Sequence, residues 1–148
     1  VMEKKWAEVS VFASLIDARL GKWLTTHHGV GLTEYWALMY LAESPTRGLR
    51  VNDLAAKVGL NQSSVTRLLG RLEAKGLSLR DTCPHDGRGV FAVITDKGQQ
   101  LLDSASEAFG AEVERLLGGV SESGSGECPG LDGTHIREAF MQVGKRIV

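Results

Sequence analysis

The 148-residue sequence predicts a mainly α-helical protein that carries one small β-hairpin. Apolar residues recur at intervals of three and four along three segments, which is the period of an amphipathic helix. Two short segments with strand character, 77–82 and 90–95, flank a turn-forming stretch and predict the hairpin. No apolar run approaches the roughly 18 residues that span a bilayer. We therefore expect one folding unit in a cytoplasmic protein.

The N-terminal segment predicts a long helix with a coiled-coil-like apolar seam. It ends near the polar residues 25–29. The next helix has a start signal at Thr33, with Glu34 in its first turn, and Ser44 and Pro45 stop it. The seam of the first helix consists of Trp6, Val9, Ala13, Ile16, Leu20 and Trp23, widened by Phe12, Leu15 and Leu24.

Residues 51–77 have the spacing of two helices joined by a three-residue turn, a helix-turn-helix. Ala55 is small where the helices cross, and Gly59 lies where the chain turns with positive φ. Asn61 is a favourable N-cap for a second helix over residues 62–75. The apolar residues that can form the shared core are Leu54, Val58, Leu60, Val65 and Leu68.

The second helix of this pair has a polar outward face that suits the reading of DNA. Gln can pair with adenine through two hydrogen bonds and Arg with guanine, while Ser and Thr reach base edges or phosphates. We therefore expect a sequence-specific protein that binds double-stranded DNA. The candidate contacts on this helix are Asn61, Gln62, Ser63, Ser64, Thr66, Arg67 and Arg71, with Gly70 on the same face.

The charge distribution favours a polyanionic partner for the middle of the chain, although the net charge is only −1. Residues 47–97 hold nine Lys and Arg against five Asp and Glu, whereas residues 1–46 hold four against five and residues 98–148 hold four against eight. Basic residues are thus concentrated in the third that contains the helix-turn-helix.

The hairpin is followed by a further long helix that begins with Asp96 in its first turn. Its apolar stripe is Leu102, Ala105, Phe109, Val113 and Leu116. The Gly-, Ser- and Glu-rich stretch Gly118 to Gly133 predicts an unstructured linker. A final helix is expected to carry Ile136, Phe140, Val143 and Ile147.

The order of these elements resembles the MarR family of winged helix-turn-helix transcriptional regulators along the whole chain. The most specific local motif is Asp86-Gly87-Arg88 in the hairpin loop DTCPHDGRGVFAVIT. The resemblance implies that the hairpin is a wing, that Arg88 enters the minor groove and that Asp86 orients it. The long linker departs from the compact helical connection that is usual in the family, which leaves the geometry of the dimer cap open.

The resemblance further implies a homodimer whose first and last helices, residues 1–31 and 97–148, interlock, with residues 32–96 forming the DNA-binding lobe. A dimer would bind a pseudo-palindromic operator, as a repressor that a small aromatic or phenolic effector releases. Relatives bind aromatic anions between the dimer helices and the DNA-binding lobe. The matching aromatic residues are Trp23, Tyr35, Trp36 and Tyr40, although core packing explains them as well.

Other classes of function find less support in the sequence. No nucleophile with a base, no phosphate-cradling loop and no metal-ligand spacing is present, so we expect neither an enzyme nor a cofactor. His27 and His28 lack the spacing of a zinc site. A protein-interaction module is a further alternative. The main alternative is a redox-sensing regulator that switches through oxidation of Cys83, which lies near Arg80 and His85 in the sequence.

Overall fold

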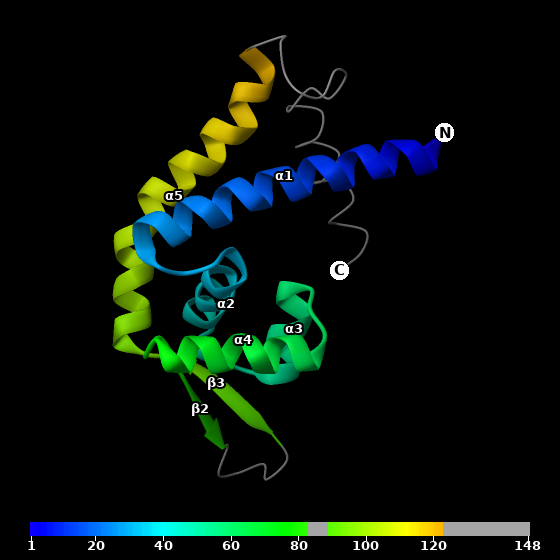
Figure 1. The fold of residues 1–148 in the computed structure, drawn as a ribbon. Helices are drawn as coiled ribbons and strands as arrows, with labels where there is room; N and C mark the ends of the chain where they lie inside the picture. The colour runs from blue at the N-terminus through cyan, green and yellow to red at the C-terminus, as the bar shows by residue number, and fades with distance from the viewer. Residues whose placement is uncertain (83–88, 123–148) are drawn as a thin grey trace. The chain divides into compact units, whose positions relative to one another are not determined.

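The computed structural model describes residues 1–82 and 89–122, and it shows five helices and a small antiparallel sheet in these ranges (Figure 1). The chain divides into two compact units, one formed by residues 21–107 and the other by residues 1–20 with residues from 108 onward. The elements are α1 (Met2–His28), α2 (Leu32–Glu43), β1 (Gly48–Arg50), α3 (Val51–Val58), α4 (Gln62–Ala74), β2 (Ser78–Thr82), β3 (Val90–Ile94) and α5 (Asp96–Glu122).

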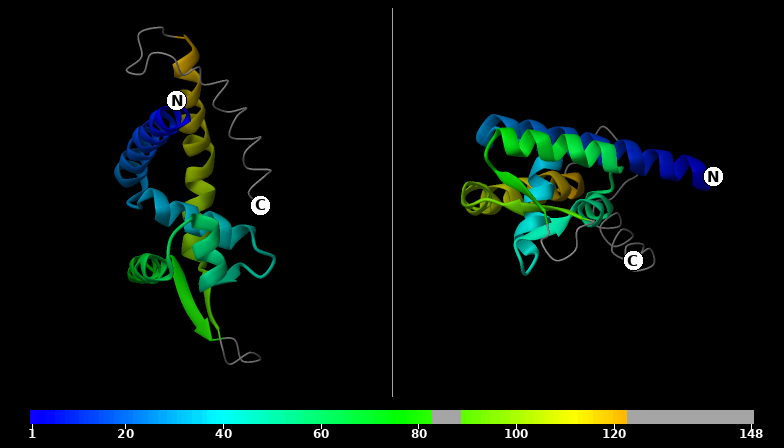
Figure 2. Two further views of the ribbon diagram at one scale, coloured as in Figure 1. Left: turned by 90° about the vertical axis from the view of Figure 1, so that its right-hand side faces the viewer. Right: turned by 90° about the horizontal axis from the view of Figure 1, so that it is seen from below.

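The unit formed by residues 21–107 packs α2, α3 and α4 against a three-stranded sheet with strand order β1-β3-β2. Strands β2 and β3 extend away from these helices as a hairpin (Figures 1 and 2). The core of this unit is aliphatic and includes Leu24, Val30, Leu38, Leu41, Leu54, Val65, Leu68, Leu69, Leu72, Leu77, Ala92 and Ile94. This core confirms the expected helix-turn-helix followed by a hairpin.

Strand β1 was not expected from the sequence. Its three residues pair antiparallel with β3, and Gly48 lies opposite Val93. A side chain at Gly48 would place Cβ 2.9 Å from the carbonyl oxygen of Ala92, so only glycine fits between the two strands. The strand precedes α3 directly and thereby ties the helix-turn-helix to the hairpin.

Helix α2 begins earlier than the sequence suggested. Gly31 is its N-cap, in place of a start at Thr33, and the backbone N–H of Gly31 donates a 3.4 Å hydrogen bond to Oε2 of Glu34. The expected stop is confirmed, because Ser44 caps the C-terminus. Glu34 therefore satisfies a backbone donor ahead of its own helix, in addition to its favourable position in the first turn.

The other unit contains the first part of α1 and the later part of α5. Phe12, Leu20, Phe109 and Leu116 are buried in these segments. By contrast, Trp6 is 65% exposed and Leu15 48% exposed, although both belong to the expected apolar seam of the first helix. No helix within the described ranges is long and apolar enough to cross a membrane.

The prediction of an unstructured linker from Gly118 to Gly133 is wrong for its first five residues, because α5 continues to Glu122. Glycine is unfavourable inside a helix by about 1 kcal/mol relative to alanine. Each residue that extends an existing helix nevertheless adds one backbone hydrogen bond without a new nucleation cost. The remainder of the linker and the expected final helix lie outside the described residues.

Candidate nucleic-acid interface

The N-terminus of α4 is held by a side-chain cap. Oδ1 of Asn61 accepts hydrogen bonds from the backbone N–H of Ser64, at 2.8 Å, and from the hydroxyl of Ser63, at 2.9 Å. Gly59, two residues before the cap, has the left-handed backbone conformation expected for the turn, with φ of 70°. These two features fix where the second helix begins and confirm the helix boundary given by the sequence.

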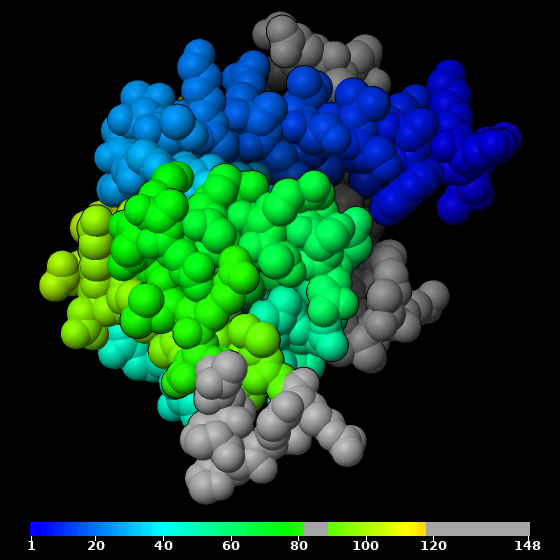
Figure 3. Space-filling view, turned by 60° about the horizontal axis from the view of Figure 1, so that its bottom comes forward, coloured from blue at the N-terminus to red at the C-terminus, as the bar shows by residue number. Residues whose placement is uncertain are grey.

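One face of α4 is completely buried, and this fixes which residues point outward. Val65, Leu68, Leu69 and Leu72 are 0–1% exposed and pack into the core of the unit. In the space-filling view α4 lies across the exposed face beside α3 and the hairpin strands (Figure 3). Of the candidate contacts, Ser64 is half-buried, while Asn61, Gln62, Ser63, Thr66, Arg67 and Arg71 are exposed.

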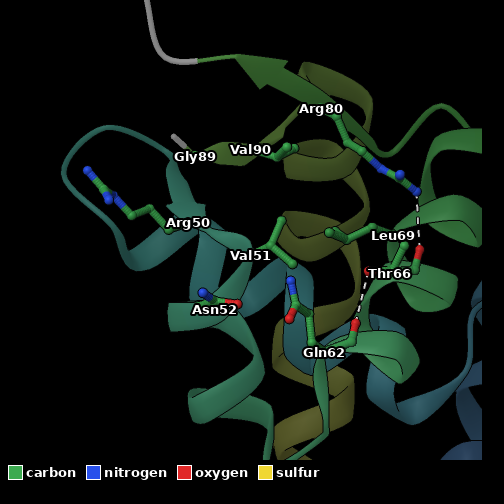
Figure 4. A pocket seen from close by; sticks show the side chains of 9 residues that line it. All are labelled: Arg50, Val51, Asn52, Gln62, Thr66, Leu69, Arg80, Gly89 and Val90. Atoms are coloured by element: carbon green, nitrogen blue, oxygen red, sulfur yellow. Dashed lines mark hydrogen bonds between the residues drawn. The ribbon is translucent and has the colours of Figure 1, made fainter. Parts of the chain in front are cut away.

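A cavity of about 290 Å³ lies between α3, α4 and the hairpin. Gln62 and Thr66, which were candidate contacts, lie at its edge (Figure 4). The hydroxyl of Thr66 donates to the carbonyl of Gln62 at 2.9 Å, one turn back along α4. The cavity is lined by Arg50, Val51, Asn52, Gln62, Thr66, Leu69, Arg80, Gly89 and Val90.

Arg80 fastens the hairpin to α4. Its Nη2 donates to the carbonyl of Thr66 at 3.1 Å, and its Nε lies 3.1 Å from a carboxylate oxygen of Glu73 (Figure 4 shows the first contact). Because these contacts are made from β2, they set the angle at which the hairpin leaves the helix. Arg50, at the other end of the cavity, lies over the ring of Phe91 at 5.7 Å.

The wing motif falls where the structure gives no description. Strands β2 and β3 pair in register from Ser78 with Ile94 to Thr82 with Val90, which confirms the hairpin. Asp86 and Arg88 lie in the loop between them, outside the described residues. The same holds for Cys83, on which the redox alternative depends.

The four aromatic residues proposed for an effector pocket have different surroundings. Tyr35 is 4% exposed, its burial raises the pKa of its hydroxyl, and its ring lies edge-on to Trp36 at 5.9 Å. Trp23 stacks on His27 with ring centroids 4.6 Å apart, and Tyr40 carries Lys57 over its ring at 5.5 Å. None of the four lines the cavity beside α4.

The sequence did not assign three charged residues, Arg50, Arg80 and Glu34, to this region. Arg50 and Arg80 border the cavity, and Glu34 forms ion pairs with Arg71 and Lys75 of the α4 region. The partners of Glu34 are 37 and 41 residues distant along the chain, so no local pattern reveals them. Within the described residues no group of His, Cys, Asp and Glu could hold a metal ion.

A helix-turn-helix whose second helix is exposed, followed by a two-stranded hairpin, defines a winged helix-turn-helix protein. Residues 28–89 match the family model described as the MarR family. Over these residues the chain is similar to the MarR family.

Curated regulators show a similar likeness over part of their length. The chain is 33% identical over 95 residues to the HTH-type transcriptional regulator MhqR of Bacillus subtilis, an alignment that covers 64% of each protein. The chain thus spans less than two thirds of the length of the curated relatives that it matches first.

Two solved structures have similar folds. A MarR family transcriptional regulator from Streptomyces coelicolor, in complex with DNA, superposes with a TM-score of 0.79 at 26% identity, covering 98% of this chain and 86% of that one. CouR from Rhodococcus jostii, bound to p-coumaroyl-CoA, gives 0.71 at 22% identity, covering 93% and 87%.

Proposed function

We propose that the protein regulates transcription by binding double-stranded DNA, with α4 in the major groove. The observation that carries this proposal is the geometry of α4. Its apolar side is fully buried and its N-terminus is capped by Asn61, while the opposite side presents polar and basic groups to solvent. A helix held in this way can enter the major groove as a rigid body.

The proposed contacts divide between the two grooves. The polar groups of α4 would meet base edges and phosphates in the major groove, and the hairpin loop would reach the adjacent minor groove. There Arg88 would enter the groove, because a guanidinium is weakly hydrated and suits a narrow, negative channel, and Asp86 would hold it in place. The major-groove set is Asn61, Gln62, Ser63, Ser64, Thr66, Arg67 and Arg71.

The active form would be a homodimer built from residues 1–31 and 97–148, with residues 32–96 as the DNA-binding lobe. The exposed apolar side chains of α1 support this, because Trp6, Val11 and Leu15 are between 48% and 65% exposed in the single chain. Large apolar side chains that are left exposed on a helix are typical of a protein interface. Two copies related by a two-fold axis would bind a pseudo-palindromic operator.

Regulation would follow from a small aromatic or phenolic ligand that releases a repressor from its operator. The support comes from the aromatic residues Trp23, Tyr35, Trp36 and Tyr40 and from p-coumaroyl-CoA, the ligand bound to CouR, whose fold is similar. Such a ligand should raise the melting temperature, since binding to the folded state stabilises it. No shift across a panel of aromatic carboxylates, phenols and their coenzyme A thioesters would contradict this part of the proposal.

The salt dependence of binding tests the DNA-binding proposal itself. Titration of a random DNA duplex at several salt concentrations should give an affinity that falls steeply with salt, because each neutralised phosphate releases about one counterion. Chondroitin sulfate, a polyanion without bases, serves as a control for charge alone. A binding signal that is absent, or one that does not change with salt, would contradict the proposal.

A further inference from the structure

The two arginines of α4 lie on different sides of the helix. Successive residues of an α-helix lie roughly 100° apart around its axis. The buried side of α4 is defined by Val65, Leu68, Leu69 and Leu72. Four other residues lie along the middle of the opposite, outward side. Arg67 is one of these, whereas Arg71 lies on the flank of the helix together with Lys75. The four residues of the outward crest are Ser63, Arg67, Gly70 and Ala74.

The flank that carries Arg71 faces Glu34 at the start of α2. Nζ of Lys75 lies 2.6 Å from Oε2 of Glu34, and Nε of Arg71 lies 3.3 Å from Oε1. Lys75 also donates to the carbonyl of Gly29 at 3.0 Å, in the α1–α2 connection. Together with the hydrogen bond from the backbone N–H of Gly31, Glu34 therefore receives donors from two separate segments.

The Glu34 carboxylate needs these partners because its side chain is only 7% exposed. A buried carboxylate without partners is strongly unfavourable, and removing one partner of a buried pair costs more than the pair contributes. Arg71 is 54% exposed, but its guanidinium could bind a DNA base only by giving up its ion pair with Glu34. Its first task is to hold the C-terminal half of α4 against α2.

Arg67 has different surroundings. It is exposed and makes no ion pair or hydrogen bond with any residue in the part of the chain that the structure describes. Its neighbour along the crest, Ala74, is small and exposed, so the helix can approach the floor of a groove closely on that side, whereas Gly70 is half-buried beside the guanidinium of Arg80. The guanidinium of Arg67 can therefore bind the edge of a base without first breaking an internal contact.

We propose that Arg67 is the arginine of α4 that determines sequence preference, and that Arg71, with Glu34 and Lys75, positions the helix without reading a base. This inference rests on the proposed DNA-binding function and divides the work within it. Guanine is the base that the proposal assigns to Arg67, because arginine forms two hydrogen bonds with its O6 and N7.

Binding-site selection from a random duplex pool tests the division, with the full-length chain and the matched variants Arg67→Ala and Arg71→Ala. For Arg67→Ala we expect the preference for guanine to fall by about tenfold or more at one position of each half-site. Its melting temperature should not change. For Arg71→Ala we expect weaker binding to all sequences by a similar factor, an unchanged base preference and a lower melting temperature.

Glu34→Gln provides a second readout that does not depend on DNA. If Arg71 acts through Glu34, the effects of Glu34→Gln and Arg71→Ala on the melting temperature should not add in the double variant, whereas Glu34→Gln and Arg67→Ala should add. Additive effects for Glu34 and Arg71 would overturn the positioning role.

The outcomes also separate this inference from the proposed function. Suppose that the parent protein selects a sequence. The inference alone would then be overturned if Arg71→Ala lost its preference at one base pair, or if Arg67→Ala kept every base preference. A parent that selects no sequence and binds no duplex would overturn the proposed function, and with it the role of Arg67.

Discussion

The backbone of Gly98 in α5 lies directly against the carbonyl group of Leu77, just before β2, with no space for a side chain between them. The same junction holds two further contacts. The hydroxyl of Thr95 donates to the carbonyl of Gly76 at 2.7 Å and accepts from the backbone N–H of Gly98 at 3.1 Å. The end of α4, the hairpin and the start of α5 therefore meet at one tightly packed point.

Gly98→Ala should destabilise the protein by roughly 1–3 kcal/mol, because a Cβ there would overlap the Leu77 carbonyl and lie 2.8 Å from Cγ1 of Ile94. The matched control is Gly110→Ala in the same helix, where nothing lies within 4 Å of the added atom. That change should be neutral or stabilise by about 0.5–1 kcal/mol. Chemical denaturation measures the free energy of unfolding of both variants. Equal values would mean that the backbone around Gly98 can accommodate a Cβ without loss of stability.

Asn61→Asp should separate folding from DNA binding. An aspartate can still accept the hydrogen bond from the N–H of Ser64, and its charge suits a helix N-terminus, so the free energy of unfolding should be retained or rise slightly. The added negative charge would face the DNA phosphates and weaken binding. Asn61→Ala should instead lower the free energy of unfolding by about 0.5–2 kcal/mol. Undiminished DNA affinity in the aspartate variant would place the N-terminus of α4 away from the phosphates.

Trp6→Glu should disrupt the proposed dimer, because it puts a charge into the exposed apolar seam of α1. Light scattering should report twice the 16.0 kDa chain mass for the parent and the single mass for the variant at micromolar concentration. Ala56→Glu, which adds the same charge at an exposed position of α3 outside the proposed dimer helices, is the matched control and should remain dimeric. A monomeric parent would contradict the two-fold arrangement.

Arg88→Ala should weaken specific DNA binding by about 1–3 kcal/mol and reduce the salt slope by about one unit, since one groove contact is lost. The melting temperature and the oligomeric state should not change. Lysine should substitute poorly, because an ammonium loses more hydration on entering the minor groove. Asp86→Ala should give a smaller loss in the same direction. If Arg88→Ala binds as the parent does at every salt concentration, the wing makes no contact with DNA.

The helix-turn-helix could be predicted from sequence because its signals are local. Asn61 caps the helix that begins at the next residue, and Gly59 takes a positive φ that few other residues adopt. The apolar period of α4 likewise separated its buried side from its exposed side.

The features that escaped prediction depend on distant parts of the chain. Strand β1 has three residues, too few for a periodic pattern, and forms only because β3 pairs with it. The position of Glu34 in the sequence indicates only a favourable acid in the first turn of a helix, because its ion-pair partners Arg71 and Lys75 are distant along the chain. Gly118 favoured a linker by composition, but the preceding turns of α5 extend the helix through it.

If α4 reads double-stranded DNA in a two-fold symmetric complex, selection from a random duplex pool by the full-length chain should reveal it. We expect one enriched pseudo-palindrome whose half-sites are centred about 10 bp apart, one turn of the double helix. The enrichment should include a guanine in each half-site that Arg67→Ala no longer selects. A pool that stays random after repeated rounds, or an enriched sequence that Arg67→Ala and Gln62→Ala select unchanged, would contradict this expectation.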